Sequence, residues 1–358
     1  MQIQRAALAE GYSLKDASAY NIQFLAGRPV LIDTLSFEPY AVGTSWPAYR
    51  QFCQHFLAPL ALMAHRDVRL GQLLRCHLDG IPLDLASGLL PRRSWLRPGL
   101  LMHLHLHART QSRYVNRDTK VRPRVISRSG LLGILDSLES AVRGLRWAPQ
   151  GTEWADYYQN TNYVDQAAAD KTATVSDWIR QCDPDSVWDL GANDGTFSRL
   201  AVEHGAQTVA WDIDAAAVEK CYRHVRSHRL SNLHPALLDL TNPSPSLGWE
   251  LRERQSFFER KPPDMALALA LIHHLAIGNN VPLELCAQFF RRIAATLIIE
   301  WVPKSDSKVA TLLCNRVDTF PDYTEASFQK AFDRHYRRLD RRPVAGSERV
   351  LYLFEAGS

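Results

Sequence analysis

The chain has 358 residues, of which 46% are hydrophobic and 22% charged, and its formal net charge is +4. The length favours two domains, and the charge is too small to indicate nucleic-acid binding by itself. The longest apolar run, Met265 to Ile272, is far shorter than the roughly 20 residues that span a bilayer. Six scattered cysteines without CxxC spacing argue for reduced thiols. We therefore expect a cytoplasmic protein with no membrane partner and no zinc site.

Residues 1–110 mix short strand-like and helical runs, which predict a small α+β domain. Asp16 and Asn21 have the spacing D-x4-N, and Asp33 follows 12 residues beyond Asn21, after a predicted hairpin turn at Gly27. This order resembles the catalytic loop and metal-binding aspartate of protein-kinase-like and aminoglycoside-kinase-like phosphotransferases, in which the Asn and the second Asp hold magnesium. The 15 residues before Asp16 leave no room for a phosphate loop and a lysine-bearing strand. We therefore expect a kinase-lobe-like accessory domain that lacks an ATP site; the alternative is a coincidence of spacing.

Three histidines, His103, His105 and His107, alternate near the end of this region. In a strand they would share one face, but no fourth metal ligand is evident. We therefore predict a partly exposed strand rather than a metal site. Residues 111–150 are rich in arginine and serine and then briefly helical, which predicts a basic linker. The basic run 334–342 is interpreted in the same way, as a solvated surface.

From residue 151 to 358, apolar strand-like runs alternate with helical patterns. This alternation is typical of a parallel sheet with helices on both faces, so we predict a Rossmann-like, doubly wound α/β domain. The predicted strands are 186–190, 208–213, 233–238, 264–270, 296–301 and 349–354. The predicted helices are 196–204, 215–228, 282–295 and 325–335.

The sharpest signal is the loop DLGANDGT, which joins the first predicted strand of this domain to its helix. Gly191 and Gly195 would let backbone N–H groups approach a ligand closely. Asn193 stands where many such loops have a further glycine, and asparagine tolerates left-handed backbone angles. The loop therefore predicts a ligand held by backbone groups at the end of the first strand.

Acidic residues follow the second and third strands. Asp212 lies 17 residues past Gly195, where doubly wound folds place a carboxylate that binds ribose hydroxyls. Asp214 is better explained as the N-cap of the helix that begins at Ala215. Asp239 follows the third strand and could accept a hydrogen bond from an adenine amino group.

The ordered series DLGANDGTFS, WDID, LLDL and DMALALALIHHL resembles the class I S-adenosylmethionine-dependent methyltransferases. The whole chain resembles nodulation-protein-like bacterial methyltransferases. A dinucleotide dehydrogenase would more typically show GxGxxG, which is absent. The resemblance implies a seven-stranded methyltransferase sheet and S-adenosyl-L-methionine as the cofactor. It implies contacts from Asp189 to the methionine amino group, from Gly191, Asn193 and Gly195 along the loop, from Asp212 to ribose, from Asp239 to adenine, and from Ala270 in the wall of the fourth strand.

Methyl transfer needs a nucleophile aligned with the sulfonium and, for some acceptors, a base. His273 and His274 leave the fourth strand on the rim that would face the sulfonium, and imidazole titrates near neutrality. Either is a candidate base; the alternative is that one of them packs and caps the loop. Glu300 and Lys304 follow the fifth strand onto the same rim. They either contact the substrate or form an ion pair with each other.

The N/D-PP-Y/F signature is absent after the fourth strand, which weakens amino groups of bases as methyl acceptors. We therefore predict a methyltransferase that acts on a small molecule, with RNA or protein as alternative acceptors. Two other classes stay open: a kinase-like phosphotransferase and a cofactor-binding protein without catalysis. Tyr158, Tyr163 and Lys171 are candidate lid contacts over the cofactor.

Overall fold

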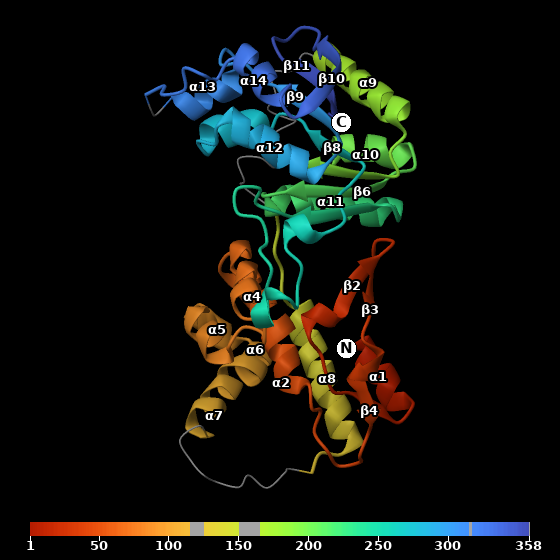
Figure 1. Ribbon diagram of the computed structural model, residues 1–358. Helices are drawn as coiled ribbons and strands as arrows, with labels where there is room; N and C mark the ends of the chain where they lie inside the picture. The colour runs from red at the N-terminus through yellow and green to blue at the C-terminus, as the bar shows by residue number, and fades with distance from the viewer. Residues whose placement is uncertain (115–124, 150–164, 315–316, 358) are drawn as a thin grey trace. The chain divides into compact units, whose positions relative to one another are not determined.

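The computed structural model describes residues 1–114, 125–149, 165–314 and 317–357 (Figure 1). It divides into an N-terminal unit, Met1–Ala148, and a C-terminal unit, Pro149–Ser358. Two of the candidate lid residues, Tyr158 and Tyr163, lie outside the described residues. Of the helices that the structure describes, none is long and apolar enough to cross a membrane.

The N-terminal unit combines helices with two small antiparallel ribbons. β1 (Tyr12–Leu14) pairs with β4 (Phe37–Pro39), and β2 (Ile22–Leu25) forms a hairpin with β3 (Arg28–Leu31). Ala26 and Gly27 have φ angles of 49° and 71°, as a tight two-residue hairpin requires. The predicted hairpin is therefore present, but Arg28 and Pro29, which the sequence also suggests for the turn, belong to β3. The helices are α1 (Gln2–Ala9), α2 (Tyr49–Phe52), α3 (Ala58–His65), α4 (Leu73–Cys76), α5 (Leu83–Leu89), α6 (Pro98–Leu100), α7 (His107–Tyr114) and α8 (Arg128–Arg143).

α8 belongs to the core of this unit, although the sequence suggests a linker over 111–150. Its Leu131, Leu135 and Leu138 follow helical spacing, and all three are fully buried among the N-terminal helices. The Ser127 side chain caps the helix by accepting a hydrogen bond from Gly130 N. The apolar stripe must bury its face, so this segment packs with the unit that precedes it.

The alternating histidines lie on a helix, so the predicted strand is wrong. A π-helical turn, Leu101–Leu106, runs directly into α7, and His103 and His105 are buried. Both ring nitrogens of each histidine lie 2.7 to 2.9 Å from hydroxyl groups, which belong to Tyr49, Ser87, Ser94 and Ser137. These contacts satisfy buried imidazoles and explain the histidines as packing residues.

The C-terminal unit is built on a seven-stranded sheet of order β10-β11-β9-β8-β5-β6-β7. The strands are β5 (Ser186–Leu190), β6 (Gln207–Asp212), β7 (Leu233–Leu237), β8 (Met265–Ala268), β9 (Thr296–Trp301), β10 (Tyr336–Pro343) and β11 (Val350–Ala356). β5 to β9 are parallel, and β11 runs antiparallel between β9 and β10. This confirms the predicted α/β fold with a doubly wound methyltransferase sheet.

Helices cover both faces of this sheet (Figure 1). Leu297 and Ile299 pack in the cluster that includes α12 and α14, whereas Ile298 packs in the cluster that includes α9 and α10. Alternate residues of a strand point to opposite faces, so these buried strands are apolar throughout. The helices are α9 (Asp165–Cys182), α10 (Thr196–Glu203), α11 (Ala215–His228), α12 (Leu283–Ile293), α13 (Ser307–Leu313) and α14 (Glu325–Phe332).

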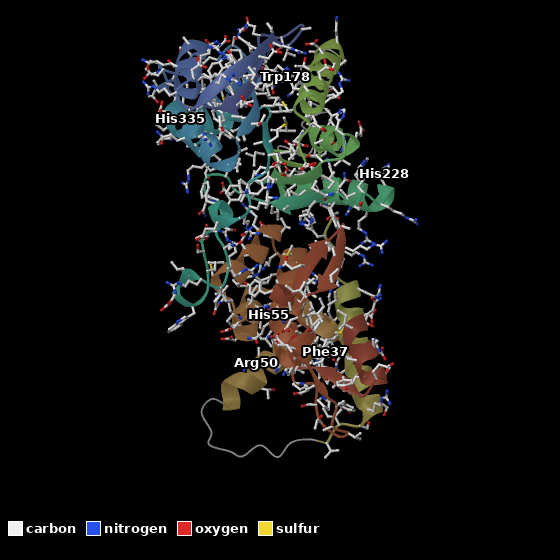
Figure 2. The ribbon with its side chains drawn as sticks, turned by 45° about the vertical axis from the view of Figure 1, so that its right-hand side comes forward. Phe37, Arg50, His55, Trp178, His228 and His335 are labelled. Carbon is white, nitrogen blue, oxygen red and sulfur yellow. The ribbon has the colours of Figure 1, made fainter. Side chains whose placement is uncertain are left out.

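β10 contains most of the basic run 334–342 and is a strand that the sequence does not predict. It lies at the edge of the sheet, where charged side chains can stay in water and discourage pairing with another chain. Trp178 of α9, labelled in Figure 2, donates its Nε1–H to Asp340 of β10 at 3.0 Å, so the strand is tied to α9. The tertiary pairing with β11 therefore overrides the weak strand pattern.

Candidate active site

The glycine loop connects β5 to α10 through three residues with left-handed backbone angles. Gly191, Asn193 and Gly195 have φ angles of 77°, 52° and 80°, which confirms the expected conformation of Asn193. A Cβ atom on Gly195 would lie 2.5 Å from Cys221 Sγ on α11. Gly195 is therefore required both by its φ angle and by the close approach of α11.

Asp212 is the last residue of β6, and its side chain accepts a hydrogen bond from the backbone of the glycine loop. Its Oδ2 accepts a hydrogen bond from Asn193 N at 2.7 Å, and its Oδ1 accepts one from Asp214 N at 2.8 Å. Asp214 in turn caps α11 by accepting from Ala216 N, as the sequence predicts. Burial raises the pKa of Asp212 to about 6. An ionised carboxylate has about four acceptor positions, so Asp212 can also accept hydrogen bonds from a ligand.

A cavity of about 270 Å³, here called the loop cavity, lies where β5, β6 and β8 end. In doubly wound folds this edge is where ligands bind. Leu269, Ala270 and Leu271 form an apolar wall. The structure brings six of the predicted site residues together around the cavity: Gly191, Asn193, Asp212, Asp239, Ala270 and His274.

The lining of the loop cavity fits a nucleoside. Asp239 Oδ1 accepts hydrogen bonds from Thr241 N and Oγ1 at 2.8 and 2.6 Å, and Oδ2 has no partner among the described residues. Asp212 and Asp239 thus place two carboxylates beside an apolar wall, as required by a ligand with an apolar ring and several hydrogen-bond donors. This chemistry suits the ribose and adenine of S-adenosylmethionine.

Asp189 is one predicted site residue that does not line the loop cavity. It is 2% exposed, and it accepts a hydrogen bond from Ser198 Oγ at 2.6 Å. Burial raises the pKa of Asp189 to about 6. Its carboxylate therefore joins β5 to α10 beneath the loop, and any influence on a ligand passes through the loop.

The structure separates the two histidines that sequence analysis treats alike. His274 is half-buried and lines the loop cavity. His273 is fully buried, and neither of its ring nitrogens has a hydrogen-bond partner among the residues that the structure describes. Burial, with a smaller contribution from His274, holds the pKa of His273 well below its ordinary value. His273 is therefore a neutral packing residue, and only His274 reaches the cavity.

Glu300 is also buried away from the loop cavity. Its Oε2 lies 2.6 Å from Lys171 Nζ, and the side chains of both residues are at most 5% exposed. The predicted ion pair between Glu300 and Lys304 is wrong, because Lys304 pairs with Asp318 at 2.7 Å. The predicted lid contact by Lys171 is replaced by this buried pair, which joins residues 129 positions apart in sequence.

The kinase-like residues of the N-terminal unit form hydrogen bonds with other residues of the same unit. Asp16 Oδ1 accepts hydrogen bonds from Ser18 N and Gln51 Nε2 at 2.9 and 2.8 Å. Asn21 and Asp33 both bind Ser36 Oγ, at 3.3 and 2.6 Å, so the hairpin does bring these two side chains together. Within the described ranges, no group of three or more His, Cys, Asp and Glu residues could hold a metal ion.

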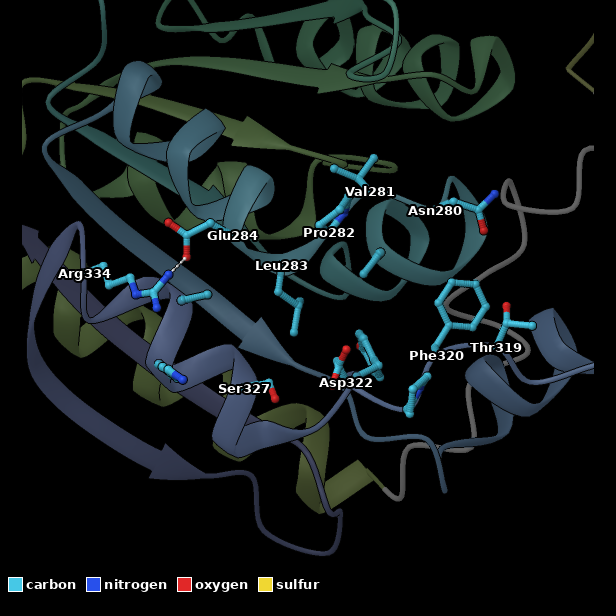
Figure 3. A pocket seen from close by; sticks show the side chains of 15 residues that line it. Asn280, Val281, Pro282, Leu283, Glu284, Thr319, Phe320, Asp322, Ser327 and Arg334 are labelled. Carbon is cyan, nitrogen blue, oxygen red and sulfur yellow. Dashed lines mark hydrogen bonds and ion pairs between the residues drawn. The ribbon is translucent and has the colours of Figure 1, made fainter.

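A second cavity of about 410 Å³, here called the α12–α14 cavity, is lined by residues that follow His274 in sequence and by residues of α12 and α14 (Figure 3). Ala276, Asn280 and Phe320 are among its lining residues, and Figure 3 shows Asn280 and Phe320 at the same end of the cavity. Figure 3 shows Glu284 and Arg334 paired at the other end of the cavity. Arg334 Nη1 lies 2.9 Å from Glu284 Oε2. The sequence gives no signal for this cavity, because its walls come from three segments without a shared motif.

The strand order of the sheet, the antiparallel β11 beside β9, the glycine loop after β5 and the acidic end of β6 together define the class I S-adenosylmethionine-dependent methyltransferases. The C-terminal unit is a member of that class. The chain is 38% identical to the nodulation protein NoeA of Rhizobium meliloti (strain 1021) over 363 residues, which cover 99% of this chain and 76% of that protein. It belongs to the same family as NoeA.

No family model matches the sequence. The N-methyltransferase NodS from Bradyrhizobium japonicum WM9 is 10% identical, with a TM-score of 0.40, covering 54% of this chain and 97% of NodS. Magnesium protoporphyrin IX methyltransferase (ChlM) from Synechocystis PCC 6803, solved with bound SAH, is 16% identical, with a TM-score of 0.39, covering 57% of this chain and 93% of ChlM.

Proposed function

We propose that the chain transfers the methyl group of S-adenosylmethionine to a small-molecule acceptor. The observation that carries the proposal is the loop cavity, where the glycine loop, Asp212 and His274 meet at the carboxyl edge of the sheet. When bound, the cofactor supplies the methyl group as an activated sulfonium, so the protein needs to align the acceptor and exclude water.

The described side chains divide this task between them. Asp212 would accept hydrogen bonds from the ribose hydroxyls, and Asp239 would accept one from the adenine edge. The backbone of Gly191 and Asn193 would hold the methionine portion. Ala270, in the apolar wall, would help to exclude water from the reacting end.

His274 is the group placed to take a proton from the acceptor. Burial, followed by the charges of Arg349 and Lys308, lowers the pKa of His274 to about 4. The imidazole is therefore neutral at physiological pH, but a pKa of about 4 makes it a weaker base than an ordinary imidazole, so it suits acceptors whose proton is readily lost. We assign His274 as the general base for acceptors that must lose a proton.

The α12–α14 cavity supports a small acceptor. Its volume lies within the roughly 300–1,000 Å³ that is usual for small-molecule sites. Its charged lining residues balance, since Glu284 and Asp322 are acidic whereas Lys330 and Arg334 are basic. RNA binding depends on surplus positive charge, so this lining favours a small molecule over RNA.

A methyl-transfer screen tests the proposal. The purified chain is incubated with S-adenosylmethionine carrying a labelled methyl group and with separate small-molecule, RNA and protein fractions of a cell extract. We expect label in the small-molecule fraction, and no label with Asp212→Ala. Label confined to RNA or protein would contradict the small-molecule assignment. Cofactor binding without transfer to any fraction would support the non-catalytic alternative.

Cofactor binding should also release protons near pH 6. The pKa of Asp212 is raised to about 6, so the free carboxyl is partly protonated there. Ribose hydroxyls that donate to the carboxylate favour its charged form and lower this pKa, so affinity should rise as the pH increases through 6. Calorimetry of S-adenosylhomocysteine binding in two buffers of different ionisation heat measures the release.

The matched control for proton release is Asp212→Asn, which leaves Asp189, whose pKa is also raised to about 6, unchanged. We expect this variant to bind with little proton release. Equal release from the variant and the wild type would assign the proton to another group, and would contradict the ribose role of Asp212.

A further inference from the structure

The buried carboxylate of Glu300 is placed to shape the loop cavity rather than to react. We propose that Glu300, held between Lys171 and Arg349, is a positioning residue that fixes the backbone of Ala270 in the conformation that binds the cofactor. This inference rests on the proposed function. Glu300 lines neither the loop cavity nor the α12–α14 cavity, so a direct catalytic role is not supported.

Ala270 has an unusual backbone at a sensitive place. It lines the loop cavity two residues beyond the end of β8, and its φ angle is 49°. Residues other than glycine, asparagine and aspartate rarely adopt this left-handed conformation, because Cβ crowds the backbone. An external contact must therefore stabilise the chain at Ala270.

Glu300 supplies that contact just beyond the last paired residues of β8 and β9. β8 and β9 pair up to Ala268 and Ile299, after which the chain leaves the ladder. The side chain of Glu300, the next residue of β9, then accepts a hydrogen bond from Ala270 N at 2.7 Å. The carboxylate thus takes the place of a strand partner and turns Ala270 toward the cavity.

Two basic side chains contact this buried carboxylate; burial lowers the pKa of Lys171, and the charge of Glu300 opposes that shift. Lys171 of α9 lies 2.6 Å from Glu300 Oε2, and Arg349 Nη1 lies 3.5 Å from Oε1. Arg349 is itself held by Asp306, at 2.7 Å. A buried carboxylate without such partners would tend to take up a proton and lose acceptor capacity. These contacts therefore hold the Glu300 carboxylate in place as the acceptor for Ala270 N.

The same cluster reaches the glycine loop. Lys171 Nζ lies 4.7 Å from the centroid of the Phe197 ring, and Phe197 is the second residue of α10, directly after the loop. A cation over an aromatic ring is attracted to its face. Lys171 therefore connects the two elements that shape the cofactor end of the cavity, the glycine loop and the turn at Ala270.

The test compares the affinity of three chains for S-adenosylhomocysteine by calorimetry. Glu300→Gln keeps the side-chain shape but cannot balance both cations, and we expect an affinity at least about tenfold weaker than wild type. Adding Ala270→Gly should restore at least threefold of this loss, because glycine adopts positive φ without an anchor. A purely structural role of Glu300 would lower the melting temperature without this rescue. Glu219→Gln, which breaks the exposed pair with Arg223 on α11, is the matched control and should bind as wild type does.

The outcomes separate the inference from the proposed function. Wild-type affinity in Glu300→Gln, or no rescue by Ala270→Gly, would overturn the positioning role. Lack of binding by the wild-type chain would overturn the proposed function and the inference with it. If Glu300→Gln does not fold, Lys171→Met replaces it; we then expect a loss of at least threefold and the same rescue, and wild-type affinity would overturn the inference.

Discussion

Asp212→Ala should weaken the affinity for S-adenosylhomocysteine by at least about 100-fold. Hydrogen bonds to a charged group contribute about 1.5–3 kcal/mol each, and the variant removes the acceptor for two ribose hydroxyls. It also removes the acceptor that holds Asn193 N and Asp214 N, so the loop loses its anchor to β6. Because about 1.4 kcal/mol corresponds to a factor of ten, a loss of 100-fold is a lower bound.

Calorimetry on folded protein measures this loss of affinity, and two further variants show which interaction causes it. Asp212→Asn retains a side-chain oxygen for the loop but lacks the charge, so it should fall between wild type and Asp212→Ala. Asp239→Ala removes a more exposed carboxylate, and a smaller loss of about tenfold is expected from one hydrogen bond. Unchanged affinity in Asp212→Ala would show that the loop cavity does not hold the ribose at β6.

His274→Ala should lower turnover by about 100-fold while cofactor affinity changes by less than about fivefold. His273→Ala should instead lower the stability of the fold and leave turnover almost unchanged. His273 is fully buried, and truncating it leaves a cavity that lowers the free energy of unfolding by about 2–4 kcal/mol. Turnover per folded molecule should then stay close to wild type. Steady-state kinetics and thermal unfolding of the two variants distinguish the base from the packing residue.

The pH dependence of turnover gives an independent check on His274. A base must be deprotonated, and the pKa of His274 is lowered to about 4, so the rate at saturating cofactor should not fall between pH 8 and about pH 5.5. An unperturbed imidazole would instead produce a limb near pH 6.5. If both histidine variants keep full turnover, methyl transfer depends on alignment alone, and the base assignment to His274 is wrong.

The sequence by itself determined the elements whose signals are local. The bounds predicted for β5, β9 and α11 agree with the structure, because each is an apolar run or an amphipathic helix with a recognisable end. Asp214 caps α11, and Asn193 has the left-handed angle expected of it, since both depend on neighbouring backbone groups. The same local signals, in the right order, predicted the class of protein.

Only the tertiary structure decided which of these residues can meet. His273 and His274 are adjacent in sequence, yet their burial separates a packing residue from one that lines the loop cavity. Glu300 pairs with Lys171, 129 residues away in sequence. An ion pair between residues so far apart produces no periodic pattern in the sequence. β10 is a strand only because β11 pairs with it, since its arginines carry no apolar alternation. Burial and long-range pairing depend on the whole packed domain, and local sequence patterns do not determine them.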